Sequence, residues 1–174
     1  MDELKQLLSK EGVLATENKE KNKQEFPAVM VLIVEEISGG INTVPYTTAK
    51  VSEYLIKNDY EVLDEKIVDK NISQEEAIQA SNGNLAAATA VALQYWSGIV
   101  ITGKTAVQAS SLKSGGLQAY GANITLRAMK ADTGDVLAVA SADGSFPHIN
   151  AMTGSRKAAE EAASKAIKKM LKDL

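Results

Sequence analysis

The residues that come closest to a known chemical motif are Gly98-Ile-Val-Ile-Thr-Gly103-Lys104-Thr105. Two glycines separated by four residues and followed by Lys and Thr match the string of a phosphate-binding loop. Such a loop needs a strand before its first glycine and a helix that begins at the lysine. Here a helical pattern precedes Gly98, and the β-branched residues that follow it favour an extended chain. We therefore predict a strand that binds no nucleotide, with Gly103 as a bulge or a point of close approach.

A second candidate is the pair of carboxylates Glu35 and Glu36, which end a predicted strand just before Gly39 and Gly40. Successive strand residues point to opposite faces of a sheet, so the two carboxylates cannot share one substrate. One of them, together with the glycine turn and Lys104, would still offer a site for a small ligand or an enzymatic reaction. Ligands of α/β sheets usually bind at such strand ends. The alternative that we prefer is a solvated strand end.

The rest of the chemical inventory is short. His148 is the only histidine and the chain has no cysteine, so the sequence offers neither the clustered ligands of a zinc site nor a recognisable catalytic triad. The string Ser110–Lys113 matches part of an acyl-enzyme motif, but it lies in a Gly-rich stretch and its partner motifs do not follow. We therefore predict no catalytic residue, no metal and no cofactor, and a protein that is not an enzyme.

The composition restricts the partners of the chain. Its 174 residues carry a net charge of -3, whereas general affinity for nucleic acid needs a basic face that displaces counterions. The longest apolar runs, Ala28–Val34 and Leu85–Leu93, fall far short of the roughly twenty residues that span a bilayer. We expect no nucleic-acid partner and no transmembrane segment in this chain.

Hydrophobic spacing divides the chain into a short N-terminal part and one domain. Residues 1–25 combine a short helical pattern with a polar run that is typical of a linker. Residues 26–174 are long enough for a single core. The expected strands there are 28–34, 60–68 and 99–108, and the expected helices surround Val51–Leu55 or begin near Ser73 and Leu85. Asn42 or Thr43 is the expected cap of the first of these helices.

The C-terminal part predicts a β-hairpin followed by a helix. Apolar residues alternate in Ala122–Lys130 and in Val136–Ala142, and the turn Asp132–Asp135 separates the two segments. From Ser155 onward apolar residues recur at helical spacing, and most are alanines that allow a helix to lie close to a sheet. These residues are Ala159, Ala162, Ala163, Ala166, Ile167, Met170, Leu171 and Leu174. We therefore predict an α/β fold, a two-layer mixed β-sheet with helices packed mainly on one face.

These elements, in this order, resemble the α/β module of bacterial envelope proteins. The most specific stretches are Ile124–Ser141, with its Asp-Thr-Gly-Asp turn, and the Ala-rich helix around Glu160–Lys169. The module occurs in the curli-secretion lipoprotein, the amino-terminal domain of TolB, flagellar assembly protein T and the lipoprotein activators of penicillin-binding proteins. The resemblance implies a non-enzymatic binding or assembly module in the periplasm or at the outer-membrane periphery. It also implies contact with other envelope proteins or with itself, and it leaves room for a lipid anchor upstream.

Two connections, 110–121 and 144–154, are the regions where we expect partner contacts. Both are long for an otherwise economical chain, and connections of that length are commonly functional. Apolar loop residues often serve as interface anchors. The predicted contact residues are Leu112, Leu117, Tyr120, Phe146, His148, Ile149 and Met152. In the alternative interpretation Phe146 and Ile149 fold back to cover the sheet edge or the end of the last helix.

Overall fold

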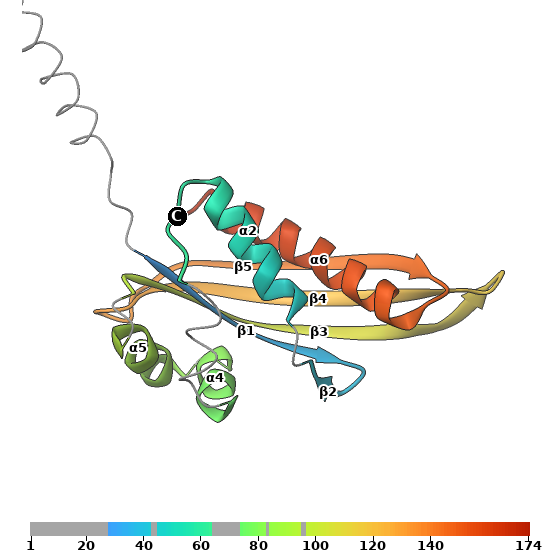
Figure 1. Ribbon diagram of the computed structural model, residues 1–174, viewed down its shortest axis with the longest axis horizontal. Helices are drawn as coiled ribbons and strands as arrows, with labels where there is room; N and C mark the ends of the chain where they lie inside the picture. The colour runs from blue at the N-terminus through green and yellow to red at the C-terminus, as the bar shows by residue number, and fades with distance from the viewer. Residues whose placement is uncertain (1–27, 43–44, 64–73, 83, 95–96) are drawn as a thin grey trace, which may run out of the picture.

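The computed structural model describes residues 28–42, 45–63, 74–82, 84–94 and 97–174. A five-stranded sheet crosses this part of the chain in the order β2-β1-β3-β4-β5 (Figure 1). The strands are β1 (Val29–Ile37), β2 (Gly40–Ile41), β3 (Ile99–Ser114), β4 (Leu117–Lys130) and β5 (Val136–His148). β1 pairs in parallel with β3, and the other neighbouring strands pair antiparallel. The predicted mixed sheet is confirmed.

The helices lie on both faces of the sheet but cover them unequally. They are α2 (Tyr46–Lys57), α4 (Gln74–Ser81), α5 (Leu85–Gln94) and α6 (Ala151–Met170). The α6 face, covered by α2 and the long α6, carries most of the helical packing, as predicted (Figure 1). On the other face α4 and α5 cover only one end. No helix in the described ranges is long and apolar enough to cross a membrane.

Small residues bring α6 close to the sheet. Its inner stripe is fully buried from Ala158 to Met170, and it meets the small side chains Ala138, Ala140 and Ala142 of β5. Gly144 continues this row, and a Cβ there would lie 2.2 Å from the carbonyl oxygen of Ala158. The predicted stripe is confirmed from Ala159 to Met170, whereas Leu174 lies beyond the helix and is exposed. The helix begins at Ala151 and not near Ser155. The earlier start follows from Asn150, whose side chain accepts a hydrogen bond from the Thr153 amide at 3.0 Å.

A second, smaller core lies under α4 and α5. Alternate residues of β1 and β3, such as Met30, Leu32 and Val100, point to this face and meet Met129 from the end of β4. From Ile99 onward the phosphate-loop string lies in β3, so the strand predicted for it is confirmed. Gly103 is a point of close approach, because a Cβ there would lie 2.7 Å from the carbonyl oxygen of Thr125.

Some expected elements are shorter or lie outside the described residues. Of the predicted strand 60–68, Val62 forms a single parallel bridge with Val29, and residues beyond 63 are outside the described ranges. The N-terminal helix and linker predicted at 1–25 and the predicted helix start at Ser73 also lie outside them. The helices α4 and α5 are present close to where the spacing placed them.

Candidate functional site

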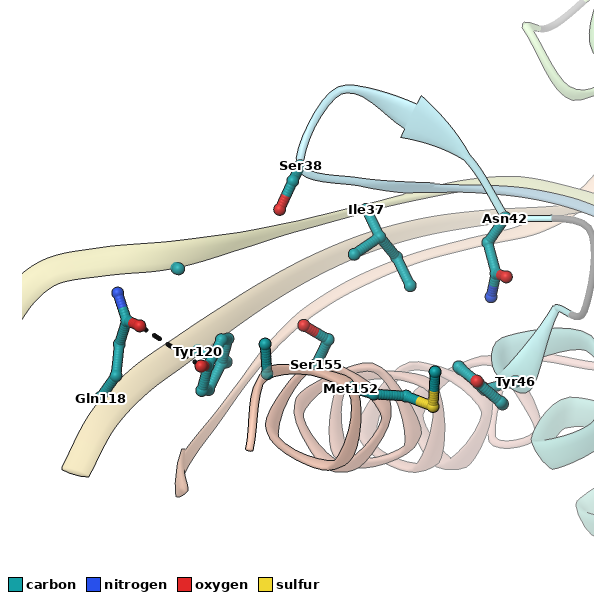
Figure 2. A pocket seen from close by; sticks show the side chains of 10 residues that line it. Ile37, Ser38, Asn42, Tyr46, Gln118, Tyr120, Met152 and Ser155 are labelled. Carbon is teal, nitrogen blue, oxygen red and sulfur yellow. Dashed lines mark hydrogen bonds between the residues drawn. The ribbon is translucent and has the colours of Figure 1, made fainter. Parts of the chain in front are cut away.

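A pocket of about 280 Å³ opens where β1 ends and both α2 and α6 begin (Figure 2). The later part of β3 and the start of β4 form one wall of the pocket, and the first turns of α6 form another. The lining residues are all uncharged: Ile37, Ser38, Asn42, Tyr46, Ala109, Gln118, Tyr120, Ala151, Met152 and Ser155. Such a lining suits an uncharged group that has both apolar surface and hydrogen-bonding atoms.

The buried carboxylate of Glu35 bonds Asn42, one of the residues that line the pocket. Glu35 is 1% exposed, and its Oε2 accepts hydrogen bonds from the amide of Thr47 at 3.0 Å and from its hydroxyl at 2.9 Å. The side-chain amide of Asn42 donates from Nδ2 to Oε1 of Glu35 at 2.6 Å. Thr47 lies in the first turn of α2, where backbone amides lack partners within the helix, so Glu35 caps this helix from the neighbouring strand. The prediction of a solvated strand end was wrong for Glu35.

The predicted cap of α2 also needs correction. The helix begins after Pro45, which makes no side-chain capping bond, and Thr43 lies outside the described residues. The side chain of Asn42 donates to the Glu35 carboxylate, which accepts from the Thr47 amide. The backbone amide of Asn42 also donates to the carbonyl of Glu35 at 2.8 Å. Glu35 therefore bonds both Asn42 and, in the first turn of α2, Thr47.

Tyr120 forms an inner wall of the pocket. Its side chain is 3% exposed, and it packs on Gly154, where a Cβ would lie 2.1 Å from the ring. The Tyr120 hydroxyl donates to Gln118 Oε1 at 3.3 Å (Figure 2). Gln118 Nε2 donates to the carbonyl of Ser110 at 2.8 Å. Tyr120 was predicted to contact a partner, and the structure places it within the domain, at the pocket wall.

Ser155 brings a hydroxyl to the same pocket. The residue is 5% exposed, and no hydrogen bond to its hydroxyl is present among the described residues. In Figure 2 it lies between Tyr120 and Met152 on the helix that lines the pocket. A hydroxyl can both donate a hydrogen bond to a bound group and accept one from it.

Two exposed apolar side chains lie at the start of α6, beside the pocket. Ile149 and Met152 are 75% and 72% exposed. Met152 lines the pocket, and Ile149 lies two residues before Ala151, which also lines it. We call Ile149 and Met152 the apolar rim. Leu117 and Ile41 are also exposed, but they lie on the opposite face of the sheet, because Leu117 alternates with Gln118 along β4 and Ile41 pairs with Glu36. Isolated apolar side chains on a surface are ordinary, but two neighbouring ones beside a concave site suit a contact surface.

The two connections expected to carry partner contacts are not loops. β3 and β4 continue to a turn at Gly115 and Gly116, both with positive φ. Residues 144–148 belong to β5, and α6 begins at Ala151. Pairing with neighbouring strands overrides the low strand propensity of the Ser and Gly residues in both segments. The side chain of Leu112 lies outside the described part of the structure.

Phe146 and His148 lie at the end of β5 and are half-buried. Their rings stack with centroids 6.2 Å apart, and Phe146 packs against the main core. The Asn150 amide donates to Nδ1 of His148 at 2.9 Å, which fixes the short link to α6. The expectation that Phe146 folds back is therefore met, whereas Ile149 remains exposed.

The alternative site at the strand ends is not assembled. Glu35 points to the α6 face, whereas Lys104 lies on the opposite face and pairs with Glu36 at 2.8 Å. Gly39 forms a turn with positive φ, and a Cβ there or at Gly40 would meet no side chain. The described residues also contain no group of three or more His, Asp or Glu side chains that could hold a metal. A catalytic or ligand site built from Glu35, Gly39, Gly40 and Lys104 is not favoured.

Comparisons with known proteins identify a shared fold. The hypothetical protein CT253 from Chlamydia trachomatis has a TM-score of 0.51 and 9% identity, over 84% of this chain and 94% of that chain. The LpoB C-terminal domain from Salmonella enterica has a TM-score of 0.46 and 12% identity, over 67% and 81%. Lipoprotein GNA1162 from Neisseria meningitidis has a TM-score of 0.47 and 14% identity, over 72% of this chain and 86% of that chain. No family model and no curated protein matches this sequence. The likeness to the chlamydial protein shows that this α/β fold recurs in another bacterial protein.

Proposed function

We propose that this chain is a non-enzymatic binding module of the bacterial cell envelope, and that its apolar rim and pocket contact another envelope protein. The envelope assignment, in the periplasm or at the outer-membrane periphery, follows from the resemblance of Ile124–Ser141 and Glu160–Lys169 to envelope modules. The observation that carries the proposal is the exposure of Ile149 and Met152, three-quarters each, beside an uncharged cavity.

The chemistry of the pocket defines the group that it accepts. Charged partner groups would lose their hydration in a pocket that supplies no opposite charge. An apolar or aromatic side chain of a partner would instead cover Ile37 and Met152, and the hydroxyl of Ser155 would bond a carbonyl or amide next to it. Anchoring side chains in desolvated pockets contribute most of the affinity of many interfaces.

The predicted contact residues take two different roles in this proposal. Ile149 and Met152 contact the partner directly, because their side chains are exposed beside the pocket. Phe146 and His148 act as positioning residues, since their stacked rings and the bond to Asn150 hold the link that presents Ile149. Tyr120 shapes the pocket wall. Leu112 and Leu117 remain proposed contacts near the tip of the β3–β4 hairpin.

Site-specific photo-crosslinking in the source bacterium tests the proposal. A photoreactive residue at Ile149 or Met152 should capture a distinct envelope protein, whereas the same residue at Ile56 or Val139 should not. The two controls are 61% and 52% exposed and apolar, so they match the chemistry of the rim but lie on α2 and β5.

The captured protein is then purified and its affinity for the chain is measured. The double variant Ile149→Ser, Met152→Ser should weaken the Kd at least about tenfold, which corresponds to about 1.4 kcal/mol. The control double variant Ile56→Ser, Val139→Ser should leave the Kd unchanged, and neither should lower the melting temperature. Equal capture from rim and control positions, or an unchanged Kd in the rim variant, would contradict the proposed contact surface.

A further inference from the structure

Among the described residues, the outermost strand β5 leaves one long edge of the sheet without a neighbouring strand. Within the same ranges β5 (Val136–His148) pairs with β4 alone, whereas the opposite edge is formed by the two residues of β2. Free strand edges expose backbone donors and acceptors to which another strand can pair, and proteins block them by several devices. The β5 edge is therefore a place where association between chains must be promoted or prevented.

Three side chains of α6 bond the backbone of this edge. The carboxylate of Glu161 accepts a hydrogen bond from the amide of Ser145 at 3.1 Å. Lys165 donates to the carbonyl of Asp143 at 3.1 Å, and Lys169 donates to the carbonyl of Ser141 at 2.9 Å. We call Glu161, Lys165 and Lys169 the edge guard. Each of the three occupies a backbone group that a further strand would need.

The spacing of the guard matches the spacing of the edge. Four residues of an α-helix rise about 6 Å, and two residues of a strand rise about 6.6 Å. Side chains four apart on α6 therefore reach backbone groups two apart on β5, as the three bonds show. The helix and the strand run in opposite directions, so later guard residues reach earlier strand residues. One straight row of side chains covers the middle of the edge.

The alternation of β5 explains why these backbone groups are free. In an antiparallel edge strand, every second residue points both of its backbone groups away from its neighbour. Ser141, Asp143 and Ser145 hold these outward positions, because their backbone groups bond α6 side chains. Pro147 is the next residue in this series and has no backbone donor. The blocked stretch thus extends to the end of the strand.

The guard residues also support one another. Glu161 and Lys165 form an ion pair at 2.7 Å across one helical turn. The bonds from Lys165 and from the Ser145 amide hold the pKa of Glu161 below its usual value. The carboxylate therefore stays charged and available as an acceptor over the neutral range.

We propose that the edge guard keeps β5 from pairing with β5 of a second copy of this chain, and that removing it produces an edge-to-edge dimer. The second copy is the fitting occupant because two β5 strands pair antiparallel about a twofold axis. With Ala142 at the axis, Ser141 of one copy faces Asp143 of the other and Val139 faces Ser145, so the two Asp143 carboxylates are not opposite each other. Unlike the proposed partner contact, this association uses the backbone and not the apolar rim.

The test compares two triple variants that change the net charge equally. Glu161→Ala, Lys165→Ala, Lys169→Ala removes the guard. Glu160→Ala, Lys157→Ala, Lys172→Ala removes one acid and two lysines whose side chains make no bond to the β5 backbone in the described part of the chain. Sedimentation should give twice the parent mass for the guard variant at concentrations where the control variant keeps the parent mass. An unchanged mass of a folded guard variant would overturn the proposal.

A proline substitution then identifies the surface of association. Ser141→Pro removes an outward amide, so it should return the guard variant to the parent mass and leave the mass of the parent chain unchanged. An enlarged mass that persists with Ser141→Pro would show that another surface is responsible. If the alanine variant does not fold, Lys165→Met with Lys169→Met keeps the alkyl stems on the helix and removes both ammonium groups. For this variant too, twice the parent mass would support the proposal and an unchanged mass would overturn it.

Discussion

The two faces of the sheet are built from the same strands but differ in how they meet their surroundings. On the α6 face, alternate residues such as Ala140 and Ile124 form a continuous core beneath a close-packed helix. On the opposite face, α4 and α5 cover only Met30, Leu32 and their neighbours. Beyond them lies an exposed area of the sheet that we call the open face; it carries Lys104, Asn123, Thr125 and Arg127.

Because of this difference, substitutions on the two faces of the same strands should affect the free energy of unfolding unequally. The small buried residues of the α6 face allow a helix to pack close to the sheet. Each atom added on this face displaces packed neighbours. The open face carries polar side chains in water, where substitutions change little. We therefore expect paired substitutions on β4, β5 and α6 to give very unequal effects.

The largest difference is expected for a new carboxylate on either face. Ala163→Glu places an unpaired charge against the sheet at a fully buried position and should lower the free energy of unfolding by about 2 to 5 kcal/mol. Thr125→Glu adds the same group on the open face, opposite Lys104 in the register, and should change it by less than about 0.5 kcal/mol. Urea denaturation measures both. Similar losses in the two variants would show that the packed face is misassigned.

A smaller difference is expected for one methyl group at two glycines. Gly144→Ala brings a Cβ to 2.2 Å from the Ala158 carbonyl and 2.7 Å from the Ala162 amide, so α6 must shift. Overpacking of this kind costs about 1 to 3 kcal/mol. Gly121→Ala on β4 meets nothing within 4 Å and should be neutral or stabilise by about 0.5 kcal/mol. Melting curves of the two variants would contradict this account if Gly121→Ala were the more destabilised.

The smallest effect is expected for Lys104→Ala on the open face. The ion pair with Glu36 joins two side chains that are 45% and 36% exposed, and exposed pairs contribute between about 0 and 1 kcal/mol. Calorimetric titration of the parent chain with ATP or GTP and magnesium should give no saturable heat, since the string is extended strand. Micromolar binding that disappears in Lys104→Ala would instead establish a phosphate site there.

The C-terminal hairpin and helix could be predicted because their determinants are local. Strand alternation and the helical stripe each need only neighbouring residues. The turn between the strands is closed by its own side chains, since Asp132 accepts from the Thr133 amide at 2.8 Å and the Thr133 hydroxyl donates to Asp135 at 2.7 Å. Gly134 supplies the positive φ that the turn requires.

The pocket could not be predicted because its parts are distant in the sequence. The burial of Glu35 depends on where α2 lies over β1, which no pattern near residue 35 encodes. The extension of β3 through Ser110 depends on pairing with β4 and overrides a Gly- and Ser-rich sequence. The exposed apolar pair Ile149 and Met152 could be identified from the sequence, whereas Ser155 was assigned only as the start of a helix. Asn150 was the available cue for the true helix start.

The capping of α2 by Glu35 has a consequence for how the domain loses its structure. A helix of 12 residues is marginal in water without outside support, and the acceptor for its first turn belongs to β1. If β1 separates from β3, α2 loses its cap, and if α2 departs, a carboxylate is left buried without its partners. The two elements therefore open as one cooperative unit. Tyr46 is the first residue of that helix, so this wall of the pocket persists only while the β1–β3 pairing is intact.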